Sequence, residues 1–232
     1  MNKDTKQTEQ SFGSEIETEE SLFEKCKNII KHNKLAFFSL LVIILIILCA
    51  IFANVVCRYN PYTQSLKDRL LAPSFAHLLG TDELGRDTLT RVIFGARISL
   101  TIGLIPTLIS MIIGTILGLI AGYFGGKIDF AIMRLADIML AFPSLLLAMV
   151  VMYTMGGGLI NIFIALSLVN WASTSRVVRS ETLSLSKKEY VEAAKSMGVG
   201  NATIIFRHIL PNCIPTLVVL FTLSIPSAIL SE

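Results

Sequence analysis

The chain has 232 residues, 53% of them hydrophobic and 16% charged, with a formal net charge of +3. Soluble domains usually carry about 25% charged residues, and the hydrophobic residues here gather in long runs, as they do in membrane proteins. The small net charge, without a basic stripe of interleaved aromatic residues, argues against nucleic acid as a partner. The cysteines form no CxxC pair and the histidines have no ligand spacing, so we assign no metal and no cofactor.

Residues 1–34 are polar and mixed in charge, and we expect a cytoplasmic tail with a surface helix in "ETEESLFEKCKNIIKHNK". Residues 35–57 are nearly uncharged and predict the first membrane span, because about 20 apolar residues cross a hydrocarbon core of about 30 Å. Residues 58–97 contain Pro61, Pro73 and several turn-forming residues. They predict an ordered extracytoplasmic loop with a short helix that leads into the next span.

The second span is predicted at about residues 98–121. Gly114, Gly118 and Gly122 recur at every fourth position. They leave a smooth stripe along one face of the helix, which lets another helix approach closely. Pro106 lies in the same span, and we expect it to bend the helix.

The third span is predicted at about residues 130–153. Arg134 and Asp137 lie three residues apart near its start, so the two side chains would share one face of the helix and could pair. Pro143 interrupts the middle of this span. It predicts either a simple kink or a flexible wall along a substrate path, since broken helices line many transport pathways.

The fourth span is predicted from about 159 to 178 and the fifth from about 212 to 230. Lipid cannot satisfy the polar side chains of the fourth span, so we expect them to face protein or a cavity. These residues are Asn161, Asn170, Trp171, Ser173, Thr174 and Ser175. Lysines crowd the start of the first span and favour a cytoplasmic amino terminus, although the loop at 58–97 is also basic. Four spans from that terminus return the chain to the cytoplasm at 176–211.

The segment at 176–211 is polar and predicts two short helices. Ser186 and Glu189 fit the capping-box pattern, so the first helix is expected to begin at Lys187. Gly198 is placed to end this helix near Met197 with a left-handed cap. The second helix would be capped by Asn201 and would stop at Pro211, before the fifth span.

The first of these helices has one apolar face, made by Tyr190, Ala193, Ala194 and Met197 at helical spacing. The face is too small for a core of its own. Its two alanines make it flat, which favours insertion into a groove on another protein. A DNA-reading helix–turn–helix is not favoured, because membrane spans hold both ends of the segment.

Residues 192–211, "EAAKSMGVGNATIIFRHILP", resemble the EAA loop of ATP-binding-cassette importer permeases. The family pattern is Glu-Ala-Ala, three residues, Gly, nine residues, Ile, any residue and Leu-Pro. The matching residues are Glu192, Ala193, Ala194, Gly198, Leu210 and Pro211. His208 departs from the pattern, in place of Ile. Residues 77–100, "HLLGTDELGRDTLTRVIFGARISL", are similar to a signature of the second permease subunit in dipeptide, oligopeptide and nickel importers.

This resemblance implies an all-α, polytopic membrane protein with the type I importer permease fold, about five of whose expected six helices are present. Residues 98–232 would form an incomplete permease domain. The resemblance also implies that the segment at 176–211 carries a coupling helix seated in a cytoplasmic ATPase. The expected docking residues are those matching the EAA pattern, together with Tyr190 and Met197.

The partners implied by the resemblance are a second homologous permease subunit, two cytoplasmic ABC ATPase subunits and an extracytoplasmic solute-binding protein, in the lipid of a bacterial cytoplasmic membrane. The chain itself has no G-x-x-x-x-G-K-[ST] loop, the usual device for holding ATP phosphates. We therefore expect a transport subunit that is not an enzyme, with ATP hydrolysis in a separate chain.

The leading hypothesis is a permease subunit of an ATP-driven importer for dipeptides, oligopeptides or a related small solute such as nickel. One alternative is a stand-alone secondary carrier or channel. That class would need intramembrane ionisable residues, and few occur beyond Arg134 and Asp137. The other alternative is a nonfunctional truncated permease, because the sequence ends after the fifth expected span.

Overall fold

A computed structural model describes residues 33–230 of the chain. The surface helix predicted for the amino-terminal tail therefore lies almost entirely outside the described residues. Within them the structure is helical and contains no β-strand, apart from an isolated bridge between Thr81 and Asp87. This confirms the all-α prediction for the described part. Contacts divide the chain into two compact units, one up to Ile93 and one from Phe94.

The first unit contains α3 (Lys34–Ile51), α4 (Ala53–Val56), η1 (Leu66–Asp68) and the start of α5 (Thr88–Phe124). Helix α3 begins where the Asn33 side chain accepts hydrogen bonds from two free backbone N–H groups, those of Leu35 and Ala36, at 3.1 and 3.3 Å. Its length and composition suit a membrane span, as predicted for the first apolar run.

The loop between α4 and α5 is ordered by hydrogen bonds around two aspartates. Asp82 accepts from the backbone N–H groups of Leu84 and Arg86, each at 2.9 Å, and forms a salt bridge with Arg86 at 2.8 Å. Asp87 accepts from the backbone N–H of Thr90 at 2.8 Å, and its other oxygen lies 3.0 Å from Nδ1 of His77. The predicted short helix and the second span form one helix. Asp87 caps its start, and α5 then runs for 37 residues without a break.

The pKa of Asp87 is held below its ordinary value. Burial disfavours the charged form, but hydrogen bonds from Thr90 and His77 to the carboxylate outweigh that effect. The charged carboxylate therefore suits its place at the positive end of the α5 dipole.

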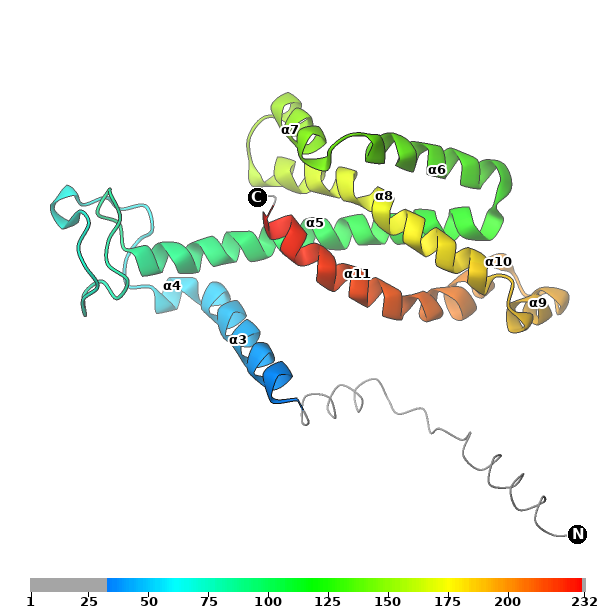
Figure 1. Ribbon diagram of the computed structural model, residues 1–232, viewed down its shortest axis with the longest axis horizontal. Helices are drawn as coiled ribbons and strands as arrows, with labels where there is room; N and C mark the ends of the chain where they lie inside the picture. Colours follow the sequence, from blue (N-terminus) through cyan, green and yellow to red (C-terminus); the bar gives the residue numbers. More distant parts are fainter. Residues whose placement is uncertain (1–32, 231–232) are drawn as a thin grey trace, which may run out of the picture. The chain divides into compact units, whose positions relative to one another are not determined.

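The second unit holds the rest of α5 and seven further helical segments, coloured from green to red in Figure 1. They are α6 (Gly126–Ala141), α7 (Ser144–Met155), α8 (Leu159–Leu185), α9 (Glu189–Ser196), α10 (Asn201–Thr203), the π-helical η2 (Ile204–Ile209) and α11 (Leu210–Leu230). Helix α8 packs against α6, α7 and α11, and its inner residues, from Ala165 to Leu185, form much of the buried interior.

The glycine stripe of α5 lies directly against α8, as predicted. A Cβ atom on Gly114 would lie 2.7 Å from the carbonyl oxygen of Trp171, and one on Gly118 would lie 2.7 Å from that of Ser175. A Cβ atom on Gly122 would likewise lie 2.7 Å from the carbonyl oxygen of Arg179, four residues after Ser175 on α8. Each step of four residues on α5 therefore matches a step of four on α8, and only glycine permits this backbone contact.

The third predicted span is divided at Phe142–Pro143. Helices α6 and α7 meet there at an angle of 91°, so the interruption is a sharp break and not a simple kink. Phe142 has extended backbone angles, the conformation that the residue before a proline favours.

The predicted pair of Arg134 with Asp137 is wrong. Asp137 accepts a hydrogen bond from Arg176 of α8 at 2.7 Å, and the guanidinium of Arg134 lies 5.9 Å from the centre of the Phe130 ring. The partner of Asp137 is 39 residues away in the chain, because α6 packs side by side with α8.

Three of the described helical segments are long and apolar enough to span a membrane: Lys34–Ile51, Thr88–Phe124 and Asn201–Leu230. The bent pair of α6 and α7 would make a fourth. Helix α8 has 27 residues but carries more polar side chains, so its role as a span, and the total of five, stay predictions.

Candidate functional site

Helix α9 begins two residues later than predicted, and the capping box is not formed. The Ser186 hydroxyl donates to the carbonyl of Leu183 at 3.0 Å, and the backbone N–H of Ser186 donates to Thr182 at 2.9 Å. Ser186 therefore still belongs to the last turn of α8 and cannot turn its hydroxyl towards α9. The cap of α9 is Lys188, which provides no side-chain hydrogen bond.

The end of α9 matches the prediction at Gly198. Its φ of 80° lies in the left-handed region, which favours glycine. The N–H of Gly198 donates to the carbonyl of Lys195 at 3.0 Å, and that of Val199 donates to Ala194 at 3.1 Å. These two bonds form a Schellman motif, which satisfies the last carbonyls of the helix and turns the chain sharply.

The predicted apolar face of α9 is divided between two environments. Tyr190, Ala193 and Met197 are exposed, whereas Ala194 is buried against the rest of the chain. The residue that shares this burial is Val191, which is 0% exposed and which sequence reasoning missed. Its spacing of three from Ala194 is the signal that could have identified it.

The side chain of Glu192 lies on the exposed side of α9 and makes no hydrogen bond or ion pair with any described residue. Ala193 is beside it on that side. The exposed surface of α9, which we define as Glu192, Ala193, Met197 and Tyr190, is therefore small, has a single unpaired charge and projects from a buried opposite face.

The second predicted helix does not stop at Pro211. Helix α10, η2 and α11 follow without a break, and the N–H of Leu210 donates to the carbonyl of Ile205, five residues earlier. This wide π-helical turn lies directly before Pro211. In a regular α-helix, a proline has no N–H to donate and its ring crowds the carbonyl four residues earlier. Leu210 is half-buried against the core, and Pro211 is exposed.

Tyr123, at the end of α5, holds the turn that follows α9. Its hydroxyl donates to Oδ1 of Asn201 at 2.9 Å, and the ammonium of Lys195 lies 5.0 Å from the centre of its ring. The prediction that Asn201 caps the second helix is wrong, because its side chain is engaged by Tyr123 and Gly200 occupies the cap position. His208, which departs from the EAA pattern, has its ring 6.5 Å from that of Tyr190.

Beneath α9 lies a continuous hydrophobic core, which we call the base. It joins α5, α8, α9, η2 and α11, and its members are Leu119, Val178, Leu185, Val191, Ala194, Ile204, Ile205, Ile209, Cys213 and Leu217. Thr216 of α11 donates a hydrogen bond to Glu181 of α8 at 3.0 Å within this region. Arg179 of α8 makes a salt bridge with Asp129 of α6. The exposed surface of α9 is thus joined through the base to α5, α8 and α11.

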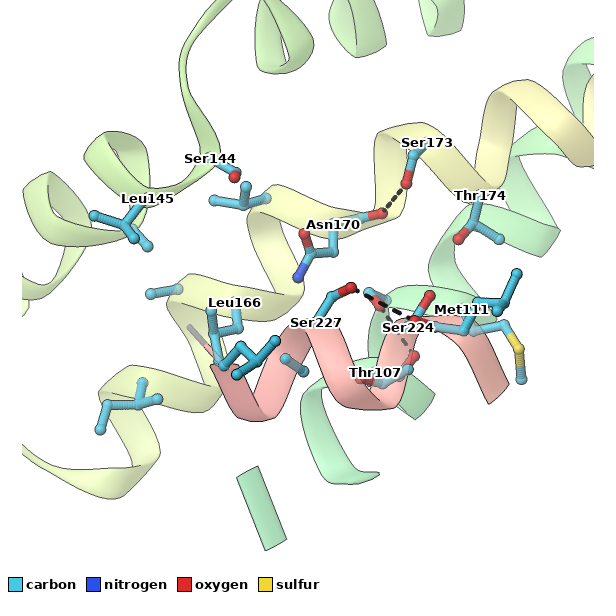
Figure 2. A pocket seen from close by; sticks show the side chains of 18 of the residues that line it. Thr107, Met111, Ser144, Leu145, Leu166, Asn170, Ser173, Thr174, Ser224 and Ser227 are labelled. Atoms are coloured by element: carbon cyan, nitrogen blue, oxygen red, sulfur yellow. Dashed lines mark hydrogen bonds between the residues drawn. The ribbon is translucent and has the colours of Figure 1, made fainter. Parts of the chain in front are cut away.

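The second feature of this unit is a cavity of about 740 Å³ lined by residues of α5, α7, α8 and α11. Figure 2 shows side chains from these helices converging on it, with Asn170 and Ser173 on α8 and Ser224 and Ser227 on α11. Three of the polar residues predicted for the fourth span, Asn170, Ser173 and Thr174, line the cavity. Asn161 instead donates to the carbonyls of Met155 and Gly156 at 2.9 and 2.8 Å.

Comparison with known proteins identifies the class. Residues 114–232 match the family model described as binding-protein-dependent transport system inner membrane component. Residues 28–73 match the N-terminal TM domain of oligopeptide transport permease C. The chain therefore belongs to the family of binding-protein-dependent transport system inner membrane components, which agrees with its apolar helices and confirms the resemblance to importer permeases.

Individual relatives are named as oligopeptide or dipeptide permeases. The chain is 41% identical to the oligopeptide transport system permease protein OppC of Bacillus subtilis, over 87% of this chain and 66% of the relative. It is 45% identical to the dipeptide transport system permease protein DppC of Alkalihalophilus pseudofirmus over the same shares. It is 40% identical to the OppC protein of Escherichia coli, over 100% of this chain and 78% of the relative. The chain thus spans slightly less than two thirds of the length of the first two relatives.

Proposed function

We propose that this chain is a membrane-spanning subunit of an ATP-driven importer for oligopeptides or dipeptides. It forms the path together with a second, homologous permease subunit. Two cytoplasmic ATPase subunits and an extracytoplasmic solute-binding protein complete the transporter. The proposal is supported by the names of the relatives, which are oligopeptide and dipeptide permeases.

The observation that carries the proposal is the exposed surface of α9. Glu192 is unpaired among the described residues, and the opposite face of the same helix is buried in the base. An unpaired charge beside a flat alanine suits a groove on another protein. Because the base joins α9 to α8 and α11, a movement of the bound ATPase passes directly to the membrane helices. ATP binding and hydrolysis in the partner would then shift the path between inward-facing and outward-facing states.

The experiment compares Glu192→Lys with Glu83→Lys in cells that express the complete transporter. Both glutamates are exposed, so both variants should fold and insert, and only the first changes the proposed docking surface. We expect Glu192→Lys to lose co-purification of the ATPase and peptide uptake, with normal amounts of the subunit in the membrane. We expect Glu83→Lys to keep the ATPase. Normal uptake and normal ATPase recovery with Glu192→Lys would contradict the proposal.

A further inference from the structure

We propose that the cavity between α5, α7, α8 and α11 binds the peptide backbone of the cargo and does not discriminate by side-chain charge. The inference rests on the proposed function and assigns a ligand to a part of the chain that the docking surface does not involve. Its volume of about 740 Å³ lies within the range of about 300–1,000 Å³ that small-molecule sites occupy.

The polar lining of the cavity consists of hydroxyl and amide groups. It is made by Thr107 and Ser110 of α5, Ser144 of α7, Asn170, Ser173 and Thr174 of α8, and Ser224 and Ser227 of α11. None of the described residues that line the cavity is charged. A peptide group is itself neutral and carries one donor and one acceptor, so this lining matches the backbone of a peptide better than its charged ends or side chains.

Asn170 is the central polar group. Its side chain extends into the cavity in Figure 2 and makes no hydrogen bond with any described residue. A carboxamide offers both donors and acceptors, and the Asn170 side chain is exposed and therefore accessible to a ligand in the cavity. A peptide group bound beside Asn170 would satisfy both halves of the amide.

The serine hydroxyls are arranged as acceptors. Ser173 donates its proton to the carbonyl of Asn170 at 3.1 Å, and Ser224 donates to that of Leu220 at 2.7 Å. Each hydroxyl proton is thus engaged within its own helix, and the oxygen lone pairs remain for a donor in the cavity. Backbone N–H groups of a peptide are suitable donors. Asn170 and these serines together present both kinds of partner that an extended backbone needs.

The apolar part of the lining is adaptable. Met149 and Met152 of α7 and Met111 of α5 border the cavity, and methionine side chains adjust to ligands of different shape because they are unbranched and flexible. No residue of α7 is buried, so much of the surface of this wall is not covered by the rest of the described chain. An adaptable, uncharged wall beside fixed backbone-binding groups is the arrangement expected of a site that accepts many peptide sequences.

A negative charge placed in this cavity should create the discrimination that the native lining lacks. We would measure uptake of Ala-Lys-Ala and Ala-Glu-Ala by the complete transporter in proteoliposomes, for the wild type, Asn170→Asp and Asn212→Asp. Asn212 is exposed and does not line the cavity, so the third variant is a matched control. We expect similar uptake of both peptides by the wild type and by Asn212→Asp, and a lysine-to-glutamate preference of about tenfold in Asn170→Asp.

The outcomes separate the two proposals. Wild-type transporter that imports neither peptide contradicts the proposed function. Wild-type uptake of both peptides, with an unchanged ratio in Asn170→Asp, contradicts only the inference about the cavity. If Asn170→Asp fails to assemble, Ser227→Asp places the charge on α11 instead, and the same shift is expected. Failure of a charged thiol reagent to label Ser173→Cys would also overturn the inference, because lipid or protein would then fill the cavity.

Discussion

Helices α9 and α7 both lie in the second unit, and their surroundings differ sharply. Val191 of α9 and Ile204 and Ile209 of η2, against which α9 packs, are 0% exposed. Helix α7 has no buried residue, and its sequence, SLLLAMVVMYTM, is apolar on every side. Helix α9 is amphipathic, so its sequence selects one face for burial, whereas α7 has no face that its neighbours are bound to cover.

The two ends of α8 also differ in how they are packed. Around the base, α8 is held by the glycine contacts of α5, by the salt bridge to α6 and by α11. Around the cavity, Ala165 and Val169 of α8 are buried, whereas the Asn170 and Ser173 side chains are exposed and face open volume. Close-packed regions transmit displacement as rigid bodies, and loosely packed ones adapt to ligands. Under the proposed function, α8 would transmit the movement of the ATPase at the end held by the base, and its exposed polar side chains at the other end would face the cargo.

The contrast between the base under α9 and helix α7 is tested most strongly by truncating one leucine to alanine in each. Leu185 is buried in the base and Leu146 of α7 is about half exposed. Leu185→Ala should lower the free energy of unfolding by about 2–5 kcal/mol, since it leaves a cavity in the core. Leu146→Ala should cost less than about 0.5 kcal/mol. Denaturant titration of the purified subunit in detergent measures both, and equal losses would show that α7 is packed as firmly as the base.

The glycine contacts give the next largest effect. Gly118→Ala would place a Cβ atom 2.7 Å from the carbonyl oxygen of Ser175, whereas a Cβ on Gly95 of the same helix meets no atom within 4 Å. We expect Gly118→Ala to destabilise the chain by about 1–3 kcal/mol. Gly95→Ala should be neutral or should stabilise α5 by up to about 1 kcal/mol. If the two variants had the same thermal stability, α5 and α8 could not be in backbone contact.

The turn after α9 predicts a smaller effect. Gly198 has a φ of 80°, and Gly200 has a φ of −63°, with no atom near a Cβ at either position. Alanine is strained only in the first conformation, so Gly198→Ala should cost about 1–2 kcal/mol and Gly200→Ala should be tolerated. Hydrogen exchange of the α9 amides measures the local loss. Unchanged protection in Gly198→Ala would mean that the turn does not determine the end of the helix.

The smallest effects belong to the two salt bridges between α6 and α8. The Asp129 and Arg179 side chains are 17% and 29% exposed, and those of Asp137 and Arg176 are 50% and 54% exposed. Exposed pairs contribute about 0–1 kcal/mol. Asp129→Asn should therefore destabilise the subunit more than Asp137→Asn, whose effect should be a few tenths of a kcal/mol. The reverse order in thermal denaturation would show that the contact of Asp137 with Arg176 is the stronger of the two.

Sequence reasoning succeeded where a feature depends on local spacing. The stripe at Gly114, Gly118 and Gly122 could be predicted, because a four-residue glycine repeat indicates close packing of two helices. The left-handed cap at Gly198 could be predicted because a glycine directly after an amphipathic segment indicates the end of a helix. The membrane class and the polar lining of the fourth span followed from composition in the same way.

It failed where a partner is distant in the chain. Asp137 pairs with Arg176 and not with its neighbour on α6, and Asn201 bonds to Tyr123, 78 residues away. The capping box failed for a local reason: Ser186 ends α8, so its hydroxyl donates to the carbonyl of Leu183, three residues earlier. The polar side chains of the fourth span were expected to face protein or a cavity, but the other walls of the cavity were not predicted, because its lining comes from four separate helices.

The central claim is that α9 is the docking site for a separate ATPase. Disulfide crosslinking tests it most directly. Cysteines introduced by Ala193→Cys and Val191→Cys would be crosslinked to single-cysteine ATPase variants in membranes that contain the complete transporter. Ala193 is exposed and Val191, two residues away, is 0% exposed. We predict a crosslinked permease–ATPase product from Ala193→Cys and none from Val191→Cys. No product from Ala193→Cys, at normal levels of both subunits, would contradict it.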